Sequence, residues 1–238
     1  MRGLGTIVNA AAVLAGGGIG LVLRGGLKKR YQDIMMQALG LATMFVGLTG
    51  ALQGMLTVQN GVLGSQGTLL LVLSMTLGAL AGEFLNIEKK LEQFGEFLKR
   101  KVHAEKNGQF VEAFVTTSLV ICIGAMAVVG ALEDGLNGNA GMLFVKSALD
   151  FAIVIVFAST LGVGSLFSAI PIVLWEGSIT AAAVFIAPYL SDAMISDLSA
   201  VGSVLIFAVG INLLFDRGIK VGNLLPALLG PVLYHIFR

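Results

Sequence analysis

Two carboxylates and a lysine lie within a strongly apolar part of this sequence. Residues 146–181 read KSALDFAIVIVFASTLGVGSLFSAIPIVLWEGSITA, with Lys146 at the start, Asp150 four residues later and Glu176 near the end. An ionisable side chain is costly in an apolar medium and is usually kept there because a function needs it. These three residues are therefore the first candidates for binding an ion or a proton.

The spacing of Lys146 and Asp150 puts both side chains on one side of a helix. One interpretation is an internal ion pair that neutralises a carboxylate entering the membrane. The other makes Asp150 a cation or proton site that Lys146 tunes. The spacing fits both interpretations.

Glu176 has no basic residue near it in sequence and is followed by Gly177 and Ser178. Two Gly/Ser-rich stretches, Leu-Gly-Val-Gly-Ser at residues 161–165 and Trp-Glu-Gly-Ser at residues 175–178, predict breaks in the helix. At the second break, free backbone carbonyls could join Glu176 in holding an ion. Glu176 could equally face the cytoplasm if the segment at 165–190 is short. We therefore expect this segment to be either a discontinuous span or a re-entrant one.

Three asparagines, Asn9, Asn212 and Asn223, also lie in apolar stretches. Each could form a hydrogen bond between neighbouring helices. If they converge with Asp150 and Glu176, they would form a polar centre for a cation or a small polar solute. The sequence leaves both interpretations open.

The composition requires lipid as the solvent for much of the chain. The 238 residues are 56% hydrophobic and 12% charged, with a mean hydropathy of +0.92, whereas soluble domains have about 25% charged residues. The net charge of +1 gives no reason to expect a nucleic-acid partner. We expect an all-α, polytopic transmembrane bundle that forms a single integral domain over residues 1–238, with membrane lipids as its surroundings.

About eight apolar segments can be distinguished, at residues 4–23, 34–56, 67–85, 111–132, 143–164, 170–190, 196–215 and 222–237. Residues 86–106 differ, because an apolar stripe at steps of three and four runs along an otherwise charged helix. This pattern is typical of an amphipathic helix on the cytoplasmic surface, where its lysines would attract anionic lipid headgroups or a partner.

The basic residues predict the orientation. With the N-terminus outside, the cytoplasmic connections hold 12 of the 15 Lys and Arg residues: four at 24–30, six at 89–106, and Arg217 and Lys220. This asymmetry obeys the positive-inside rule. We expect a bacterial cytoplasmic membrane protein with both termini outside.

Pairs of glycines four residues apart indicate closely packed helices. They are Gly16 and Gly20, Gly50 and Gly54, and Gly78 and Gly82. Such glycine pairs could form contacts between the chains of a homo-oligomer. They could equally well form contacts between helices of one chain. Residues 50–53 (GALQ) and 130–133 (GALE) resemble each other, which either reflects an internal hairpin repeat or arises by chance in apolar helices.

The sequence contains no motif of a catalytic or metal centre. Gly-x-Ser-x-Gly, His-Glu-x-x-His, phosphate-binding loops and paired protease aspartates are all missing. The single cysteine, Cys122, lies in an apolar run and is interpreted as a small buried side chain. We therefore expect neither an enzyme nor a protein with a metal or cofactor.

The stretches GTIVNAAAVLAGGGIG, GALAGE, KSALDF and WEGSIT resemble the YdfK/YqgA-like family of bacterial inner-membrane proteins over essentially the full length. The family is defined around a domain of unknown function. The resemblance implies that Gly5, Thr6, Asn9, Lys146, Asp150 and Gly177 are hallmark positions, and that position 176 carries Gln as readily as Glu.

Two functions follow as expectations. The first is a small transporter or channel for an ion or small polar solute, with Asp150 and Glu176 in its path. The second is a non-transporting structural or regulatory membrane protein that acts through the amphipathic helix at 86–106.

Overall fold

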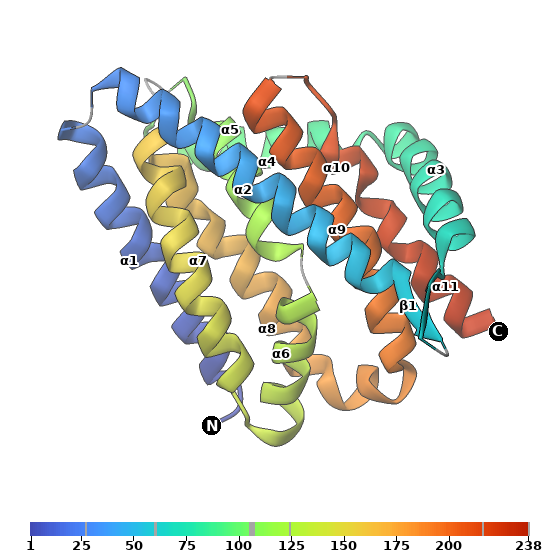
Figure 1. Ribbon diagram of the computed structural model, residues 1–238. Helices are drawn as coiled ribbons and strands as arrows, with labels where there is room; N and C mark the ends of the chain where they lie inside the picture. The colour runs from blue at the N-terminus through green and yellow to red at the C-terminus, as the bar shows by residue number, and fades with distance from the viewer. Residues whose placement is uncertain (27, 60, 105–107, 124, 216, 238) are drawn as a thin grey trace. The chain divides into compact units, whose positions relative to one another are not determined.

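The computed structural model covers residues 1–238 and describes all of them except 27, 60, 105–107, 124, 216 and 238. The described chain is almost entirely helical, so the all-α class is confirmed (Figure 1). The helices are α1 (Leu4–Gly26), α2 (Lys29–Met55), α3 (Thr68–Leu85), α4 (Ile87–Lys101), α5 (Phe110–Cys122), α6 (Ala125–Asn137), α7 (Gly141–Thr160), α8 (Ala169–Ile186), α9 (Asp192–Phe215), α10 (Val221–Leu224) and α11 (Leu229–Phe237).

Short 3₁₀ turns and one hairpin complete the described structure. The 3₁₀ turns are η1 (Val163–Ser168), η2 (Ala187–Tyr189) and η3 (Leu225–Leu228). Strands β1 (Leu56–Gln59) and β2 (Val62–Ser65) pair antiparallel between α2 and α3, with Leu56 opposite Ser65. The chain divides into two compact units: unit 1 comprises Met1–Leu39 and Leu91–Pro188, and unit 2 comprises Gly40–Lys90 and Tyr189–Arg238. The assignment of one integral domain to the whole chain stays a prediction.

Six helical segments of the described chain are long and apolar enough to cross a membrane. The bent pair α5 and α6 is a seventh if it counts as one span, and the shorter apolar stretch Val221–Phe237 corresponds to the expected eighth segment. Large apolar side chains cover the outside of these helices, among them Leu69, Phe84, Leu174 and Phe185. Such surfaces are stable only against hydrocarbon or another apolar partner.

In unit 1, α1 and α7 run side by side and in the same direction (Figure 1). A Cβ atom placed on Gly16 would lie 2.6 Å from the carbonyl oxygen of Phe151, and one on Gly20 would meet the carbonyl of Ile155. The two helices therefore touch backbone to backbone, which only glycine permits. In the same unit, an apolar core is formed by Val13, Ile121, Val154, Ala169 and Ile172.

In unit 2, α2 and α9 run antiparallel. Gly40, Gly47 and Gly54 recur every seven residues and face α9, at Leu214, Phe207 and Ala200 respectively. Gly50 lies against Ser203 of the same helix. The glycine pattern of α2 thus extends beyond the pair that the sequence suggests.

The second glycine contact of unit 2 joins α3 to the C-terminal segment. Gly78 lies against Ala227 and Gly82 against Asn223, while Gly230 lies against Ser74. The two segments are antiparallel. The parallel α1–α7 pair and the antiparallel α2–α9 and α3–α11 pairs agree with segments that alternate in direction through a membrane.

Of the two helix breaks that the sequence predicts, the structure confirms the one at residues 161–165 and contradicts the one at Trp-Glu-Gly-Ser. The Trp-Glu-Gly-Ser stretch is helical, because α8 continues from Ala169 to Ile186. In an apolar medium a glycine costs a helix only about 1 kcal/mol, whereas unpaired backbone groups cost several. The break predicted at residues 161–165 is present, because α7 ends there and Gly162, with φ +104°, leads into η1. Further breaks lie between α5 and α6, whose axes differ by 63°, and at η3.

The amphipathic helix expected at 86–106 is α4, from Ile87 to Lys101; residues 105–106 lie outside the described residues. Its buried side includes Gly95 and Leu98, and Gly95 packs against Phe114 and Val111 of α5. Phe97 remains exposed, and the last turn carries Lys99, Arg100 and Lys101. Part of the apolar stripe is therefore covered by the protein's own helix.

Candidate functional site

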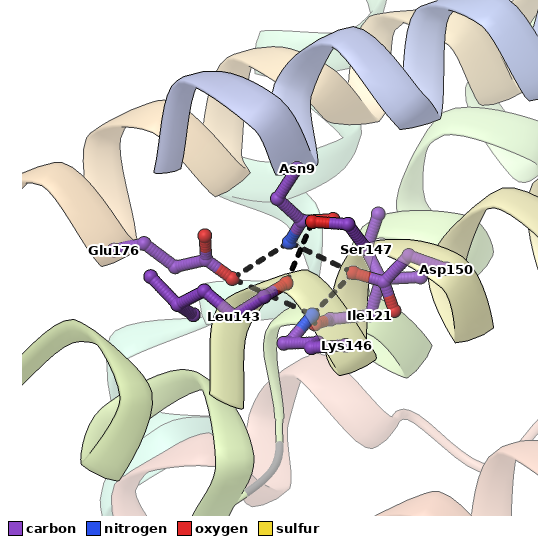
Figure 2. A network of polar contacts seen from close by, with 7 residues as sticks. All are labelled: Asn9, Ile121, Leu143, Lys146, Ser147, Asp150 and Glu176. Atoms are coloured by element: carbon purple, nitrogen blue, oxygen red, sulfur yellow. Dashed lines mark hydrogen bonds and ion pairs between the residues drawn. The ribbon is translucent and has the colours of Figure 1, made fainter. Parts of the chain in front are cut away.

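Four of the predicted candidates meet inside unit 1: Asn9 from α1, Lys146 and Asp150 from α7, and Glu176 from α8 (Figure 2). We call these four residues the polar cluster. The glycine contact between α1 and α7 brings the cluster together, because it lets the two helices approach closely. Glu176 arrives on α8, which packs against α1.

Two donors bridge two carboxylates in the cluster. The amide nitrogen of Asn9 donates to Asp150 Oδ2 at 3.0 Å and to Glu176 Oε1 at 2.9 Å. The ammonium of Lys146 donates to the same Asp150 oxygen and lies 3.5 Å from Glu176 Oε1. Figure 2 shows the two nitrogens on opposite sides of the two oxygens, so that the four groups form a closed ring.

Lys146 has a third partner, the carbonyl oxygen of Ile121 at 2.8 Å. This carbonyl is available because α5 ends at Cys122, and the last carbonyls of a helix have no partner within it. The break between α5 and α6 therefore supplies an acceptor to the ammonium. The sequence predicts one continuous segment at 111–132, so this contribution of a helix end could not be foreseen from it.

The polar cluster is closed off from solvent. Asn9 and Glu176 are 0% exposed, Asp150 4% and Lys146 5%. Lys146 forms ion pairs with both carboxylates, so the four residues of the cluster carry a net charge of −1 when fully ionised. A buried, uncompensated charge is strongly unfavourable. Such a site is therefore suited to take up one further positive charge.

Three buried oxygens around the cluster have no hydrogen-bond partner among the described residues. They are Asn9 Oδ1, Glu176 Oε2 and Thr6 Oγ1. Thr6 lies one turn before Asn9 on α1, and its methyl group lies 4.0 Å from where a Cβ of Gly177 would stand. Buried polar groups are nearly always paired, so unpaired ones call for a ligand, an ion or water.

Asp134 is a buried carboxylate that is not among the candidates predicted from the sequence. It is 0% exposed and accepts hydrogen bonds from the backbone N–H groups of Gly3 and Gly5, at 3.2 and 2.9 Å. These groups open α1, where free N–H groups and the helix dipole favour a negative charge. Only the glutamate and aspartate at 133–134 hinted at it, and nothing in sequence linked them to α1.

Asn212 and Asn223 belong to unit 2 and have partners there. Asn212 donates to the carbonyl of Ile219 and accepts from its N–H, which closes the turn between α9 and α10. Asn223 donates to Glu83 at 2.6 Å and accepts from the N–H of Glu88 at 2.7 Å. Both asparagines therefore act in local structure, and their hydrogen bonds do not involve the polar cluster.

Glu83 also forms an exposed ion pair with Lys220 at 2.8 Å. The hydrogen bond and the charge of Glu83 raise the pKa of Lys220 above its ordinary value. Both groups lie at the surface, and solvent screens such pairs. This pair fixes the start of α10 beside the end of α3.

The described residues contain no group of three or more His, Cys, Asp or Glu side chains that could hold a metal ion. Cys122 is partly buried and packs against the apolar core of unit 1. The groups in the polar cluster that could hold a cation are carboxylate and amide oxygens. They suit a proton or a hard cation better than a transition metal.

Fold and site together define a class: a multi-pass α-helical membrane protein that encloses an ionisable cluster among its helices. The chain belongs to the family described as "Protein of unknown function (DUF554)", whose model matches residues 4–236. It is 31% identical over 227 residues to the "Uncharacterized membrane protein YdfK" of Bacillus subtilis (strain 168), covering 95% of this chain and 93% of the relative.

A second relative is the "Uncharacterized protein YqgA" of Escherichia coli (strain K12). It is 31% identical over 234 residues, again covering 95% of this chain and 93% of the relative. No solved structure matches the chain. The expected family is thus confirmed, and it supports a membrane location.

Proposed function

We propose that the protein is a small transporter or channel for an ion or small polar solute, with the polar cluster in its path. The observation that carries this proposal is the unbalanced charge of the cluster, which buries two carboxylates with one ammonium. A purely structural ion pair would need one carboxylate. A second one adds cost without adding stability, unless a cation or proton visits the site.

The depth of the cluster supports this proposal. Asp150 is the tenth of the 20 residues of α7, which puts it about 14 Å along the helix. That is near the middle of a hydrocarbon layer of about 30 Å. Glu176 also lies near the middle of its helix. Many transporters hold substrate and coupling ions at this depth, beside interrupted helices such as η1 and the α5–α6 break.

The proposal places the chain in the bacterial cytoplasmic membrane with both termini outside. Its support is the concentration of basic residues in the connections at 24–30, 89–106 and 217–220. Membrane lipids are then the surroundings of the exposed apolar helices. The glycine contacts described above lie within one chain, and other copies of the chain could pack against the remaining apolar surface.

Flux measurements in proteoliposomes test the proposal. Purified protein is challenged with gradients of H⁺, Na⁺, K⁺, Cl⁻ and small polar solutes, and both current and internal pH are recorded. Asp150→Asn and Glu176→Gln should abolish whichever flux the native protein supports. Glu92→Gln removes an exposed carboxylate of α4 and should leave the flux unchanged. A flux that survives both cluster variants would contradict the role of the cluster.

The second candidate function, a structural or regulatory role through α4, rests on the exposed Phe97 next to the basic last turn. A helix with this composition can lie on anionic lipid. Replacing Lys99, Arg100 and Lys101 by Gln should then release α4 from anionic vesicles without affecting the polar cluster. If no gradient is dissipated by well-folded protein, this second function becomes the better explanation.

A further inference from the structure

The polar cluster has oxygens that its own donors do not use. Each carboxylate oxygen in the ring is occupied, because Asn9 and Lys146 both bind Glu176 Oε1 and Asp150 Oδ2. The second oxygen of Glu176, the amide oxygen of Asn9 and the hydroxyl of Thr6 have no partner in the described part of the chain. All three side chains are at least 95% buried.

These oxygens come from two adjoining surfaces. Thr6 and Asn9 are three residues apart on α1 and therefore lie on the same side of that helix. Glu176 and Gly177 lie opposite them on α8: Asn9 reaches Glu176, and Thr6 approaches the place where Gly177 has no side chain. A larger residue at position 177 would fill the space beside the Thr6 methyl group.

The net charge of the polar cluster determines which cation it can bind. Oxygen ligands suit hard cations. One monovalent cation would make the cluster neutral, whereas a divalent cation would leave a buried charge of +1, which is as costly as the charge it replaced. A proton on Glu176 Oε2 also makes the cluster neutral. Both cannot be present together without restoring an excess charge.

We propose that Thr6 Oγ1, Asn9 Oδ1 and Glu176 Oε2 bind one small monovalent cation, of which Na⁺ is the reference, and that a proton on Glu176 competes with it. This inference rests on the proposed transport function and gives it a substrate class: exchange of a monovalent cation for a proton. Charge balances, because the O–H bond of protonated Glu176 breaks and the proton leaves the site as the cation enters, and the reverse step restores that bond.

The two carboxylates then have different tasks. Asp150 shares a hydrogen bond with Lys146 and stays ionised as the counter-ion of the ammonium. Glu176 is held less tightly: its Oε1 lies 3.5 Å from the Lys146 ammonium, and its Oε2 has no partner among the described residues. Glu176 is therefore the carboxylate that binds either the proton or the cation. The titratable groups that act on Glu176 are Lys146 and Asp150 from α7. The Cys122 thiol of α5 is itself acted on by the charge of Glu176. From α1 it meets the neutral Asn9.

Thermal unfolding of the full-length protein in detergent tests the binding. NaCl is titrated against choline chloride at constant ionic strength, because a ligand that binds the folded state raises the unfolding temperature. The native protein should be stabilised by Na⁺ and not by choline. Lowering the pH by one unit should raise the half-effective Na⁺ concentration about tenfold where Glu176 is protonated, as linkage between two competing ligands requires.

Matched variants assign the oxygens. Glu176→Gln should remove both the Na⁺ response and its pH dependence. Thr6→Val keeps the side-chain shape and should weaken the binding of Na⁺ about tenfold. The stabilisation by Na⁺ that remains should keep its pH dependence. The control is Thr160→Val, because Thr160 is also buried but bonds to carbonyls of its own helix. Thr6→Ser, which retains the hydroxyl, serves if Thr6→Val does not fold.

The outcomes separate the two proposals. Equal effects of Na⁺ and choline on folded native protein, or a Na⁺ response independent of pH, would overturn the cation site. The transport proposal would still stand if a proton flux is lost in Asp150→Asn. Competitive Na⁺ binding without flux under any gradient would instead support the cation site and overturn transport.

Discussion

At the scale of single residues, Lys146 makes the burial of two carboxylates in unit 1 tolerable. Its ammonium contacts Asp150, Glu176 and the carbonyl of Ile121, and all of these contacts lie out of reach of solvent. Without the ammonium, the described cluster would hold two negative charges and no positive one. Removing one partner of a buried ion pair usually costs about 3–5 kcal/mol, because the other charge stays behind uncompensated.

Lys146→Met should therefore lower the free energy of unfolding by about 3–5 kcal/mol. Adding Asp150→Asn to Lys146→Met should restore part of this loss, since the second change removes a charge that the first left unpaired. Thermal and denaturant unfolding in detergent measure both effects. Lys89→Met, at an exposed position of α4, is the control. A Lys146→Met protein as stable as the native one would show that the ammonium does not compensate the carboxylates.

A second prediction at this scale concerns Asp134. Asp134→Ala leaves the N–H groups of Gly3 and Gly5 without their acceptor, so it should cost about 1–2 kcal/mol, the usual value of a helix cap. Hydrogen exchange should speed up at the first turn of α1 and remain unchanged at α9. Asp134→Asn keeps an acceptor oxygen and should lose less. Unchanged exchange at residues 3–7 in Asp134→Ala would contradict the capping role.

Some of these residues can be predicted from the sequence, and others cannot. Lys146 and Asp150 stand out because both lie in one apolar helix and their spacing alone brings them together. Asn9 and Glu176 can be named as polar exceptions, but they are 167 residues apart, and only the packing of α1 on α8 unites them. Asp134 could not be predicted, since a surface carboxylate and a buried helix cap look identical in sequence.

At the scale of elements, the glycines of α1 determine how closely Asn9 approaches Asp150. Gly16→Val would place its Cβ 2.6 Å from the carbonyl oxygen of Phe151. Because backbone cannot move aside cheaply, we expect a loss of about 1–3 kcal/mol and a weaker response to any ligand of the polar cluster. Unfolding temperature and flux measure the two effects.

The control for this prediction lies on the same helix. Gly18 has no described atom within 4 Å of its would-be Cβ. Gly18→Val carries the same β-branched side chain and the same intrinsic helix preference, and it should be tolerated. Similar losses in both variants would mean that valine acts on α1 itself and not on its contact with α7.

The breaks between elements were harder to predict than the helices. Long apolar runs identified α1, α3, α7 and α9, because length and hydropathy suffice for a span. Of the two breaks predicted from glycine and serine, one is present: the residues at 162–165 end α7 and form η1, whereas those at 177–178 lie within α8. The difference lies in the backbone, since Gly162 adopts φ +104°, which other residues avoid.

At the scale of the whole chain, the directions of the helix pairs constrain the topology. Parallel α1 and α7 must enter the membrane from the same side, and antiparallel α2 and α9 from opposite sides. The basic connections then predict which side is the cytoplasm. With the N-terminus outside, the β1–β2 hairpin lies outside and α4 lies inside.

Single cysteines in a Cys122→Ala background test this layout in intact cells. Val62→Cys, exposed in β2, should react with a membrane-impermeant maleimide added outside, whereas Glu92→Cys on α4 should react only after the cells are permeabilised. The reverse pattern would invert the orientation and leave the helix packing intact. Labelling of both positions from one side would contradict the alternation, because α3 alone separates the hairpin from α4 and must then fail to cross the membrane.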